Sequence, residues 1–333
     1  MRHYCTYFDH RYLPQGLALY QSMRTHIGNF RLWVLALDEE CEHTLRRTRP
    51  ERVEVVCLRE LEQADPDFRA SRQTRSLIEF YFTSTPCFLL HLLQQHSEIQ
   101  RITYLDADTY FFASPARVEK EVDESSIAIT PHRFRPELEE HRRYGIYNVG
   151  WLSFCRDPEG VACLARWREQ CLQWCRDESE AGRFGDQGYL DEWPEKYEGV
   201  RVVNQPGFNE APWNVEANKI TKKNDKIFIG NQPLVLFHFQ GLRRISPRLF
   251  NPNWHDYGLR TSRKLIREVY QPYLSTLLRA EAESGLSAKR QEFIRGQKNN
   301  TSLSLPGNIW GHIRAATKIL NGNYLLARPC APA

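Results

Sequence analysis

The segment Arg101-Ile-Thr-Tyr-Leu-Asp-Ala-Asp-Thr-Tyr-Phe-Phe112 contains two aspartates, Asp106 and Asp108, directly after an apolar stretch. Side chains two residues apart on an extended chain point the same way, so the two carboxylates are expected to lie together. Neighbouring carboxylates repel each other unless a cation lies between them. Oxygen ligands of this kind suit Mg²⁺ or Mn²⁺ held jointly with substrate phosphates. The segment therefore predicts a metal site at a strand end, and the alternative is a turn with two solvated acids.

Strand-like and helix-like stretches alternate on both sides of this segment. Apolar runs predict strands at 3–8, 31–37, 53–58, 102–105, 126–130, 149–154, 200–204 and 234–239. Helical spacing predicts helices at 15–25, 77–95 with an interruption at Pro86, and 161–175. This alternation predicts an α/β fold with a mainly parallel sheet flanked by helices. Ligands of such sheets bind beyond the carboxyl ends of the strands, which is where Asp106 and Asp108 fall.

The composition is that of a globular domain: of 333 residues, 41% are hydrophobic and 26% are charged. A net charge of +4 permits anionic partners but does not indicate nucleic acid. No run of 18 apolar residues and no signal segment is present, so we expect a protein without a spanning helix. Nine cysteines without framework spacing favour a reducing cytosol. Cys171 and Cys175, near Cys163, would share a helix face and could bind a metal, but without a second pair at zinc spacing we expect core thiols.

Further motifs follow the same order as in a known group of enzymes. They are Thr6-Tyr7-Phe8-Asp9 with Tyr12, the acidic motif, Tyr147-Asn148-Val149-Gly150, Asp186-Gln187, and His238-Phe239-Gln240-Gly241 with Arg244. In this order they resemble the GT-A (Rossmann-like) glycosyltransferases, especially glycosyltransferase family 8, which includes glycogenin and bacterial lipopolysaccharide galactosyltransferases. The resemblance covers roughly residues 1–250. It departs at Glu79-Phe80-Tyr81-Phe82-Thr83, where the family carries an Arg or Lys that contacts the donor, and Arg75 is the nearest upstream cation.

The resemblance implies a role for each matching position. The metal ligands would be Asp106, Asp108 and His238, with Mn²⁺ as the expected ion and Mg²⁺ as the alternative. The donor-binding residues would be Thr6, Tyr7, Asp9, Tyr12, Arg75, Asp106, Ala107, Gly241 and Arg244. The catalytic residues near the donor sugar would be Asn148, Asp186 and Gln187, and the reaction would retain the anomeric configuration.

Local chemistry gives His238 and Asp186 two interpretations each. His238 ends an apolar strand, where it is either a metal ligand or a structural histidine. Gly241 allows a ligand to approach the backbone closely, and Arg243 and Arg244 would complement a diphosphate. Asp186 follows Gly185 and opens a helical pattern, so it is either a carboxylate beside the anomeric centre or a helix N-cap. Both interpretations of Asp186 can hold together.

The acceptor side is assigned to His132, Trp213 and Asn214. His132 belongs to the basic stretch His132-Arg133-Phe134-Arg135, for which a solvated loop is the alternative. Aromatic faces and amides suit sugar rings, which favours the loop containing Trp213 and Asn214. The alternative is that Trp213 only packs inside an irregular loop.

The chain is expected to contain a nucleotide-sugar-binding catalytic domain at 1–260 and a helical C-terminal extension at 261–333. The tail around Trp310, Ile313, Arg314, Lys318 and Tyr324 either lies on an anionic membrane surface or packs back on the domain. We therefore expect a cytoplasmic protein with peripheral contact to the inner face of the membrane through this tail.

The predicted function is metal-dependent transfer of a hexose from a nucleotide diphosphate sugar, with UDP expected, to a saccharide or lipid-linked acceptor in surface polysaccharide biosynthesis. One alternative is a sugar-phosphate nucleotidyltransferase. It is disfavoured because the first turn, at 8–16, lacks a glycine-rich phosphate loop. The other alternative is a non-catalytic sugar-nucleotide-binding protein.

Overall fold

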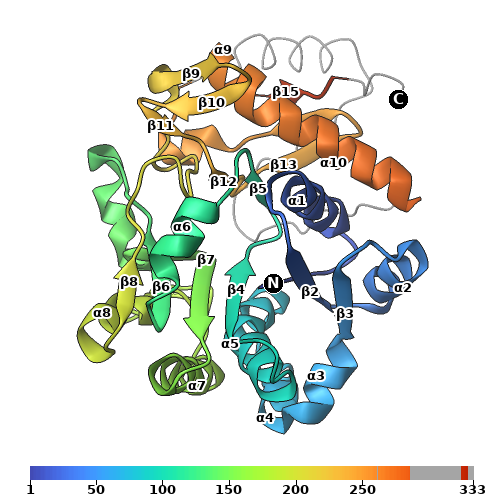
Figure 1. Cartoon of the computed structure of the whole chain (residues 1–333), viewed down its shortest axis with the longest axis vertical. Coiled ribbons are helices and arrows are strands. Elements are labelled where there is room, and N and C mark those ends of the chain that lie inside the picture. The colour runs from blue at the N-terminus through green and yellow to red at the C-terminus, as the bar shows by residue number, and fades with distance from the viewer. Residues whose placement is uncertain (261, 286–323, 329–333) are drawn as a thin grey trace.

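The computed structural model describes residues 1–260, 262–285 and 324–328. A seven-stranded sheet with the order β3-β2-β1-β4-β7-β6-β8 forms the centre (Figure 1). Its strands are β1 (Arg2–Phe8), β2 (Phe30–Ala36), β3 (Val53–Cys57), β4 (Arg101–Leu105), β6 (Ile127–Pro131), β7 (Tyr147–Cys155) and β8 (Val200–Val202). All pairs are parallel except those that β7 makes with β4 and β6. The predicted mainly parallel α/β sheet is thus confirmed.

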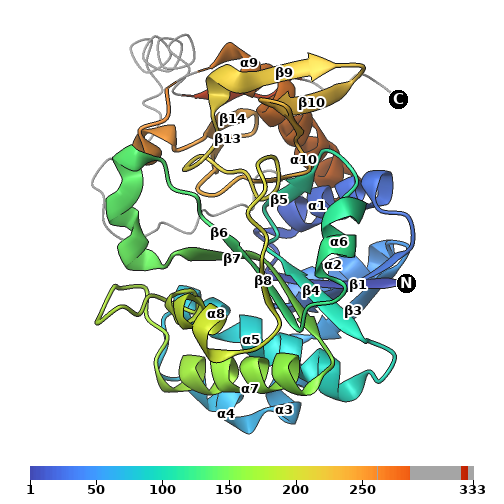
Figure 2. The ribbon, with the colours of Figure 1, turned by 60° about the vertical axis from the view of Figure 1, so that its left-hand side comes forward.

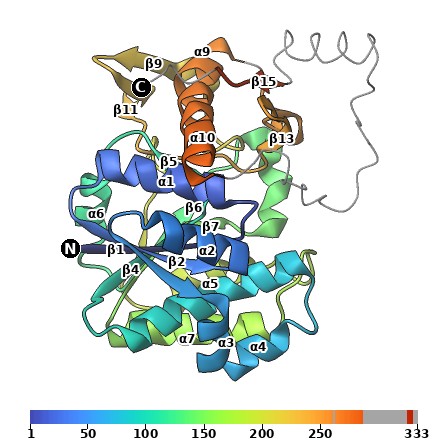
Figure 3. The ribbon, with the colours of Figure 1, turned by 90° about the vertical axis from the view of Figure 1, so that its right-hand side faces the viewer.

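Helices cover both faces of this sheet, which gives three layers (Figures 2 and 3). One layer contains α3 (Leu58–Ala64), α4 (Pro66–Ser71), α5 (Leu77–Gln95) and α7 (Pro158–Gln173), with the short η2 (Gly188–Glu192) and α8 (Trp193–Lys196). The other contains α1 (Leu13–His26), α2 (Glu39–Thr48) and α6 (Ala116–Val122). Helix starts are set by side chains that accept backbone N–H groups, such as Asp38, Asp157 and the capping box of Ser76 and Glu79.

Smaller elements build the remaining part of the molecule, above α1 in Figure 3. They are the pair β5 (Thr109–Phe111) and β12 (Leu236–His238), the sheet β9 (Ile220–Lys223), β10 (Lys226–Ile229) and β11 (Gln232–Pro233), and the sheet β13 (Arg243–Ser246), β14 (Leu249–Asn251) and β15 (Leu325–Leu326). Short turns of helix are η1 (Pro136–Tyr144), η3 (Ala217–Lys219), η4 (Trp254–Tyr257), α9 (Arg263–Leu265) and η5 (Ile266–Tyr270). The last long helix, α10 (Gln271–Ser284), packs against α1.

Most predicted elements are present, with two differences. The predicted interruption at Pro86 is wrong, because α5 continues through this residue. The predicted strand at 234–239 is shortened to β12 and pairs with β5 rather than with the main sheet. Cys163, Cys171 and Cys175 are buried free thiols, as expected for core positions. No helix in the described part of the chain is long and apolar enough to cross a membrane.

The chain after residue 260 shares a core with the residues before it. Phe237 and Phe239 pack with Tyr270 and Tyr273, and the rings of Phe239 and Tyr273 stack with centroids 3.8 Å apart. Of the residues proposed for a membrane-facing tail, Trp310, Ile313, Arg314 and Lys318 lie outside the described residues. Tyr324 is described and is buried beside β15, so for this side chain packing on the domain is the correct alternative.

A buried ion pair joins the C-terminal helix to β13. Arg244 Nη1 donates to Glu281 Oε1 over 2.7 Å, and both side chains are almost fully buried. Arg244 also donates to the carbonyl oxygens of Ser246 and Pro247. A charge at such a site is tolerated only because its partner is present.

We expect Glu281→Ala to lower the free energy of unfolding by about 3–5 kcal/mol, because the guanidinium of Arg244 then stays buried without its counter-charge. Urea denaturation measures this difference. Glu283→Ala is the matched control on the same helix, since Glu283 is exposed and its carboxylate accepts a hydrogen bond from Gln21 at the surface. It should change stability by no more than about 0.5 kcal/mol. Equal losses in the two variants would contradict a special role for the buried pair.

Candidate functional site

The two aspartates of the acidic motif lie at the carboxyl end of β4. The Asp106 N–H donates to the Gly150 carbonyl of β7 over 3.1 Å, and the Thr109 N–H and hydroxyl donate to the Asp106 carbonyl over 3.1 and 2.8 Å. The Tyr104 hydroxyl donates to Asp106 Oδ1 over 2.7 Å. Backbone and side chain of Asp106 are therefore both fixed before any ligand binds.

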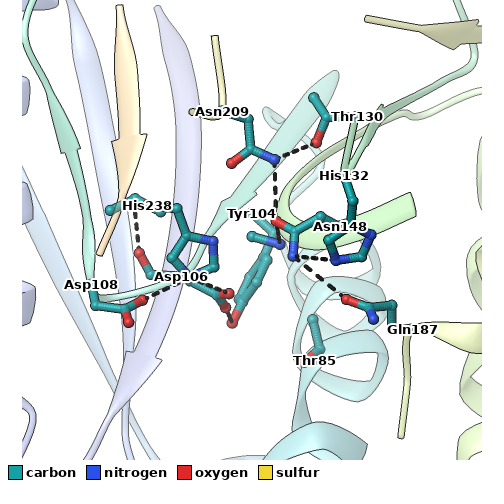
Figure 4. A network of polar contacts seen from close by, with 12 residues as sticks. Thr85, Tyr104, Asp106, Asp108, Thr130, His132, Asn148, Gln187, Asn209 and His238 are labelled. Carbon is teal, nitrogen blue, oxygen red and sulfur yellow. Dashed lines mark hydrogen bonds and ion pairs between the residues drawn. The ribbon is translucent and has the colours of Figure 1, made fainter. Parts of the chain in front are cut away.

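The pairing of β5 with β12 brings His238 to these carboxylates. Its register places His238 opposite Thr109, and the Phe239 N–H donates to the Asp108 carbonyl over 2.9 Å. His238 Nε2 lies 3.1 Å from Asp108 Oδ1 and 3.5 Å from Asp106 Oδ2 (Figure 4). One ligand atom from each residue lies within 4.8 Å of the other two. The structure thus brings all three predicted metal ligands together.

The electrostatics of this cluster fit a cation. Burial raises the pKa of Asp106, and the Asp108 carboxylate adds to this shift while His238 opposes it. Burial by itself lowers the pKa of His238, but the carboxylates of Asp108 and Asp106 outweigh it and the net pKa is raised. The ring of His238 is buried, and the ion-pair contacts of its Nε2 with Asp108 and Asp106 lack the geometry of hydrogen bonds. A buried imidazole facing two carboxylates is a typical donor set for Mn²⁺ or Zn²⁺, with the carboxylates favouring the harder ions.

Gly150 makes room for the imidazole. A Cβ atom at this position would lie 2.6 Å from His238 Nδ1 and 2.5 Å from Asn148 Oδ1, well inside van der Waals contact. Gly241 has a φ of 76°, which glycine adopts without strain. The two glycines of the predicted motifs are therefore explained by close packing and by backbone conformation.

Asp186 is buried in the loop before η2, where it contacts α5. The Thr85 hydroxyl donates to Asp186 Oδ2 over 2.9 Å, and the indole N–H of Trp167 donates to the Asp186 carbonyl over 2.7 Å. Burial raises the pKa of Asp186 to about 7; the Thr85 hydroxyl opposes the shift, and the Asp106 carboxylate adds to it. Tyr7 joins this group through its hydroxyl, 3.2 Å from Thr85 Oγ1. Asp186 is therefore a carboxyl group that carries its proton for part of the time at neutral pH.

Asn148 and Gln187 form the other side of the site (Figure 4). Asn148 Oδ1 accepts from the Gly150 N–H over 3.0 Å, and Asn148 Nδ2 lies 3.4 Å from His132 Nε2 and 3.5 Å from Gln187 Oε1. Gln187 Nε2 donates to the Tyr144 carbonyl over 2.6 Å. Burial lowers the pKa of His132 to about 3, so this imidazole is neutral and can accept a hydrogen bond from Asn148.

The residues predicted to bind the nucleoside lie at the end of β1 and the start of α1. Thr6 and Tyr7 lie near the end of β1. The Thr6 hydroxyl is buried without a hydrogen-bond partner among the described residues. Asp9 accepts from the N–H groups of Arg11 and Tyr12, from Arg11 Nε and from the Tyr81 hydroxyl. Tyr12 is exposed, and Ala107 lies between the two metal-ligand candidates.

Two predicted donor contacts are occupied elsewhere. Arg75 Nη2 donates to the carbonyls of Cys171 and Leu172 at the end of α7, over 3.2 and 3.0 Å. Arg244 is committed to Glu281 in the core. Its neighbour Arg243 is exposed instead. Burial raises the pKa of the Tyr12 and Tyr257 hydroxyls, and the positive charge of Arg243 opposes this shift, so Arg243 lies on the site side of β13. Of these two neighbouring arginines, Arg243 is therefore the exposed one and Arg244 the buried one.

The residues that were predicted to bind the acceptor are mostly buried among the side chains that surround the site. Asn214 accepts from the Ala211 N–H and donates to the His132 and Asn209 carbonyls, so its amide holds a turn. Trp213 packs edge-on against His238, with ring centroids 5.4 Å apart, and against His132. Here the packing interpretation of Trp213 fits the geometry. The solvated-loop interpretation of residues 132–135 is wrong, because Arg133 and Arg135 turn inward to the carbonyls of 208–212 and Tyr257.

Sequence reasoning missed several residues that hold the site, among them Thr85, Tyr104, Thr130 and Glu210. Tyr104 was inside the quoted motif, two residues before Asp106, and period-two alternation places both side chains on one face. The same argument could have found it. Thr85 carries no such signal, because its partner Asp186 is distant in the chain.

Comparison with known proteins places this geometry in context. The chain is 30% identical over 280 residues to the uncharacterized protein YfnD of Bacillus subtilis (strain 168), an alignment that covers 83% of this chain and 89% of YfnD. It is 29% identical over 283 residues to the uncharacterized protein YfnF of the same organism, covering 83% and 92%. No family model matches the chain.

Among solved structures, the galactosyltransferase LgtC, in complex with donor and acceptor sugar analogues, aligns over 85% of this chain and 95% of LgtC. The TM-score is 0.51 and the sequence identity is 15%. This likeness confirms the predicted GT-A fold.

We expect Gly150→Ala to weaken Mn²⁺ binding about tenfold, because the new methyl group displaces the imidazole of His238 from the two carboxylates. Isothermal titration with Mn²⁺ measures the change. Gly28→Ala is the control, since a Cβ there meets nothing within 4 Å. Unchanged Mn²⁺ affinity in Gly150→Ala would show that His238 is not a ligand.

A second expectation concerns pH. Asp186 keeps its proton in the folded chain up to a pKa of about 7, whereas the unfolded aspartate loses it near its ordinary value of about 3.9. Between these values the folded state binds more protons, so this group's contribution to stability is full below pH 4 and is lost as the pH rises towards 7. Urea denaturation of metal-free protein at pH 5 and pH 8 should therefore show a larger stability loss in the wild type than in Asp186→Asn. Identical losses would contradict the raised pKa.

Proposed function

Because this chain belongs to the family of the Bacillus subtilis protein YfnD and has the GT-A fold, we propose that it is a metal-dependent glycosyltransferase. It transfers a hexose from a nucleoside diphosphate sugar, with UDP as the expected carrier, to a saccharide or lipid-linked acceptor in surface polysaccharide biosynthesis. The observation that carries the proposal is the convergence of Asp106, Asp108 and His238 at one edge of the sheet.

The three residues that would hold a divalent cation lie where a diphosphate could contact the bound ion. Asp106, Asp108 and His238 would hold the ion, with Mn²⁺ expected, and Asp106 lies at a strand end, where open α/β sheets bind ligands. A cation bound there neutralises the leaving diphosphate and acts as a Lewis acid. Arg243 supplies an exposed guanidinium beside Tyr12 for the same phosphates.

The nucleoside would lie along the end of β1. The side chains of Tyr7 and Tyr12 offer aromatic faces, and Thr6 and Asp9 offer a hydroxyl and a carboxylate. Asp9 is held by the backbone of Arg11 and Tyr12 and by the Tyr81 hydroxyl. A carboxylate fixed in this way is oriented before the ligand arrives, which lowers the cost of binding.

The donor sugar would lie between Asp186 and Asn148. Asn148 is fixed by contacts to Gly150, His132 and Gln187, so its amide has one orientation. Preorganised dipoles stabilise the charge that develops at the anomeric carbon. Asp186 has a carboxyl group in a dry environment, suited to the face opposite the attacking acceptor in a reaction with retention. It acts there as nucleophile or as stabilising charge.

We expect Asp106→Asn and Asp108→Asn each to lower Mn²⁺-dependent hydrolysis of a UDP-hexose on the order of 100-fold, because each removes a charged ligand of the cation. The assay measures release of UDP from a panel of UDP-hexoses with and without Mn²⁺. Asp225→Asn is the control, since this side chain is almost fully exposed. Hydrolysis that persists unchanged in both site variants would contradict the assignment.

The same assay separates the alternatives. A nucleotidyltransferase would consume a nucleoside triphosphate and a sugar phosphate with release of pyrophosphate. A non-catalytic binding protein would be stabilised against heat by a UDP-sugar with Mn²⁺ but would release no UDP. Release of UDP that accelerates when a saccharide acceptor is added is the outcome expected for a glycosyltransferase.

A further inference from the structure

The loop from Gly207 to Asn214 contacts both halves of the site. Asn209 is completely buried, and Figure 4 shows its side chain joined by dashed lines to Thr130 and Asn148. Its Nδ2 donates to Thr130 Oγ1 over 2.7 Å and to Asn148 Oδ1 over 3.1 Å. The Asn209 backbone has a φ of 51°, a left-handed conformation that asparagine tolerates better than most residues. This amide therefore fixes the oxygen of Asn148, the residue assigned to the sugar side.

The next residue, Glu210, contacts the metal side through its backbone. Its N–H donates to the Leu236 carbonyl over 3.0 Å, and its carbonyl accepts from the His238 N–H over 2.7 Å. The result is an isolated parallel bridge between Glu210 and Phe237. The strand carrying the imidazole is thus held on one edge by β5 and on the other by Glu210 together with Gly207, whose carbonyl accepts from the Leu236 N–H over 3.2 Å.

A buried ion pair holds the loop in this position. Glu210 Oε1 accepts from Arg133 Nη2 over 3.0 Å and from the Gly207 N–H over 2.8 Å. The same Arg133 nitrogen donates to the carbonyls of Phe208 and Asn209 over 2.7 and 3.3 Å. Both charged side chains are largely buried, which makes this pair an unusual feature for a loop.

We propose that Asn209 and Glu210 are positioning residues that set the two halves of the site independently. Asn209 acts through its side chain on Asn148. Glu210 acts through its backbone on His238 and is kept in place by its carboxylate contact with Arg133. We call the effect of Asn209 on Asn148 the sugar arm of the proposal and the effect of Glu210 on His238 its metal arm. The sugar arm rests on the proposed function, whereas the metal arm depends only on His238 being a metal ligand.

The metal arm is tested with Glu210→Gln, which keeps the shape of the side chain but removes its charge. Mn²⁺ binding to the full-length chain, followed by the electron paramagnetic resonance signal of free Mn²⁺, should weaken about tenfold. Glu216→Gln is the matched control in the following segment, where the carboxylate pairs with the exposed Lys219. An unchanged dissociation constant for Mn²⁺ in Glu210→Gln would overturn this arm.

The sugar arm is tested with Asn209→Gly, because glycine keeps the left-handed backbone and removes only the amide. Its dissociation constant for Mn²⁺ should stay within about twofold of the wild type, whereas kcat for UDP-hexose hydrolysis should fall on the order of 100-fold. Thr130→Val, which removes the acceptor of the same amide, should shift kcat in the same direction, and Thr130→Ser should restore it.

The two arms distinguish positioning from a general loss of structure. If Asn209→Gly weakens Mn²⁺ binding as strongly as Glu210→Gln, the arms are not independent and the proposal is wrong. If Asn209→Gly leaves kcat unchanged, the sugar arm is wrong. If the wild type binds Mn²⁺ through His238 but hydrolyses none of the UDP-hexoses, the proposed function fails, and the Mn²⁺ measurements alone decide the metal arm.

Discussion

Three backbone pairs between Thr109–Phe111 and Leu236–His238 hold the site together. A two-stranded ladder of this length is not stable alone in water, so the surrounding core has to stabilise it. That core consists largely of aromatic rings: Phe237 and Phe239 pack against Tyr270, and the ring of Phe239 stacks on Tyr273. Tyr273 lies on α10, which in turn packs on α1. The position of His238 therefore depends on residues far beyond the predicted end of the catalytic domain at residue 260. The boundary itself stays a prediction, but residues 262–285 contribute directly to the support of the site.

The site concentrates negative charge in a poorly solvated place. Asp106 and Asp108 face His238. Burial raises the pKa of Asp186, and the negative charge of the Asp106 carboxylate raises it further. Two guanidiniums that were expected to contact the donor are bound elsewhere, Arg244 in the core and Arg75 at the end of α7, whereas Arg243 is exposed. The protein thus leaves the cluster to be neutralised by protons or by a bound cation. Such clusters destabilise the fold in the absence of ligand and are typical of functional sites.

The sequence predicted the layers and the juxtaposition of Asp106 and Asp108 because both depend on local patterns, whereas His238 was expected only from the resemblance. Apolar runs mark strands regardless of their partners, and two acids at period two mark a shared face. The role of Arg244 depended on tertiary structure, although one local rule bears on it. On a strand, adjacent side chains point to opposite faces, so Arg243 and Arg244 cannot both face the diphosphate. The sequence does not reveal which of them turns inward, because that depends on Glu281, which lies on a helix near the end of the described chain. The contacts of Asn209 could not be predicted for the same reason, since this loop residue has its partners Thr130 and Asn148 on two strands that are distant in the chain.

The reversed direction of β7 explains how Asn148 reaches the site. In a fully parallel sheet, the first residues of a strand lie at the edge opposite the ligand, and Asn148 is the second residue of β7. Because β7 runs antiparallel to β4 and β6, its beginning lies beside their carboxyl ends: Thr130 faces Asn148, and the Asp106 N–H donates to the Gly150 carbonyl. The motif Asn148-Val149-Gly150 can therefore supply an amide to the sugar side and an empty space for His238 within three consecutive residues. Because β6 ends and β7 begins at this same edge, residues 132–146 connect the two strands without crossing the sheet, and Arg133 and His132 of this connection turn inward to the loop that contains Asn209. Strand direction, glycine placement and loop packing are thus consequences of one topological choice.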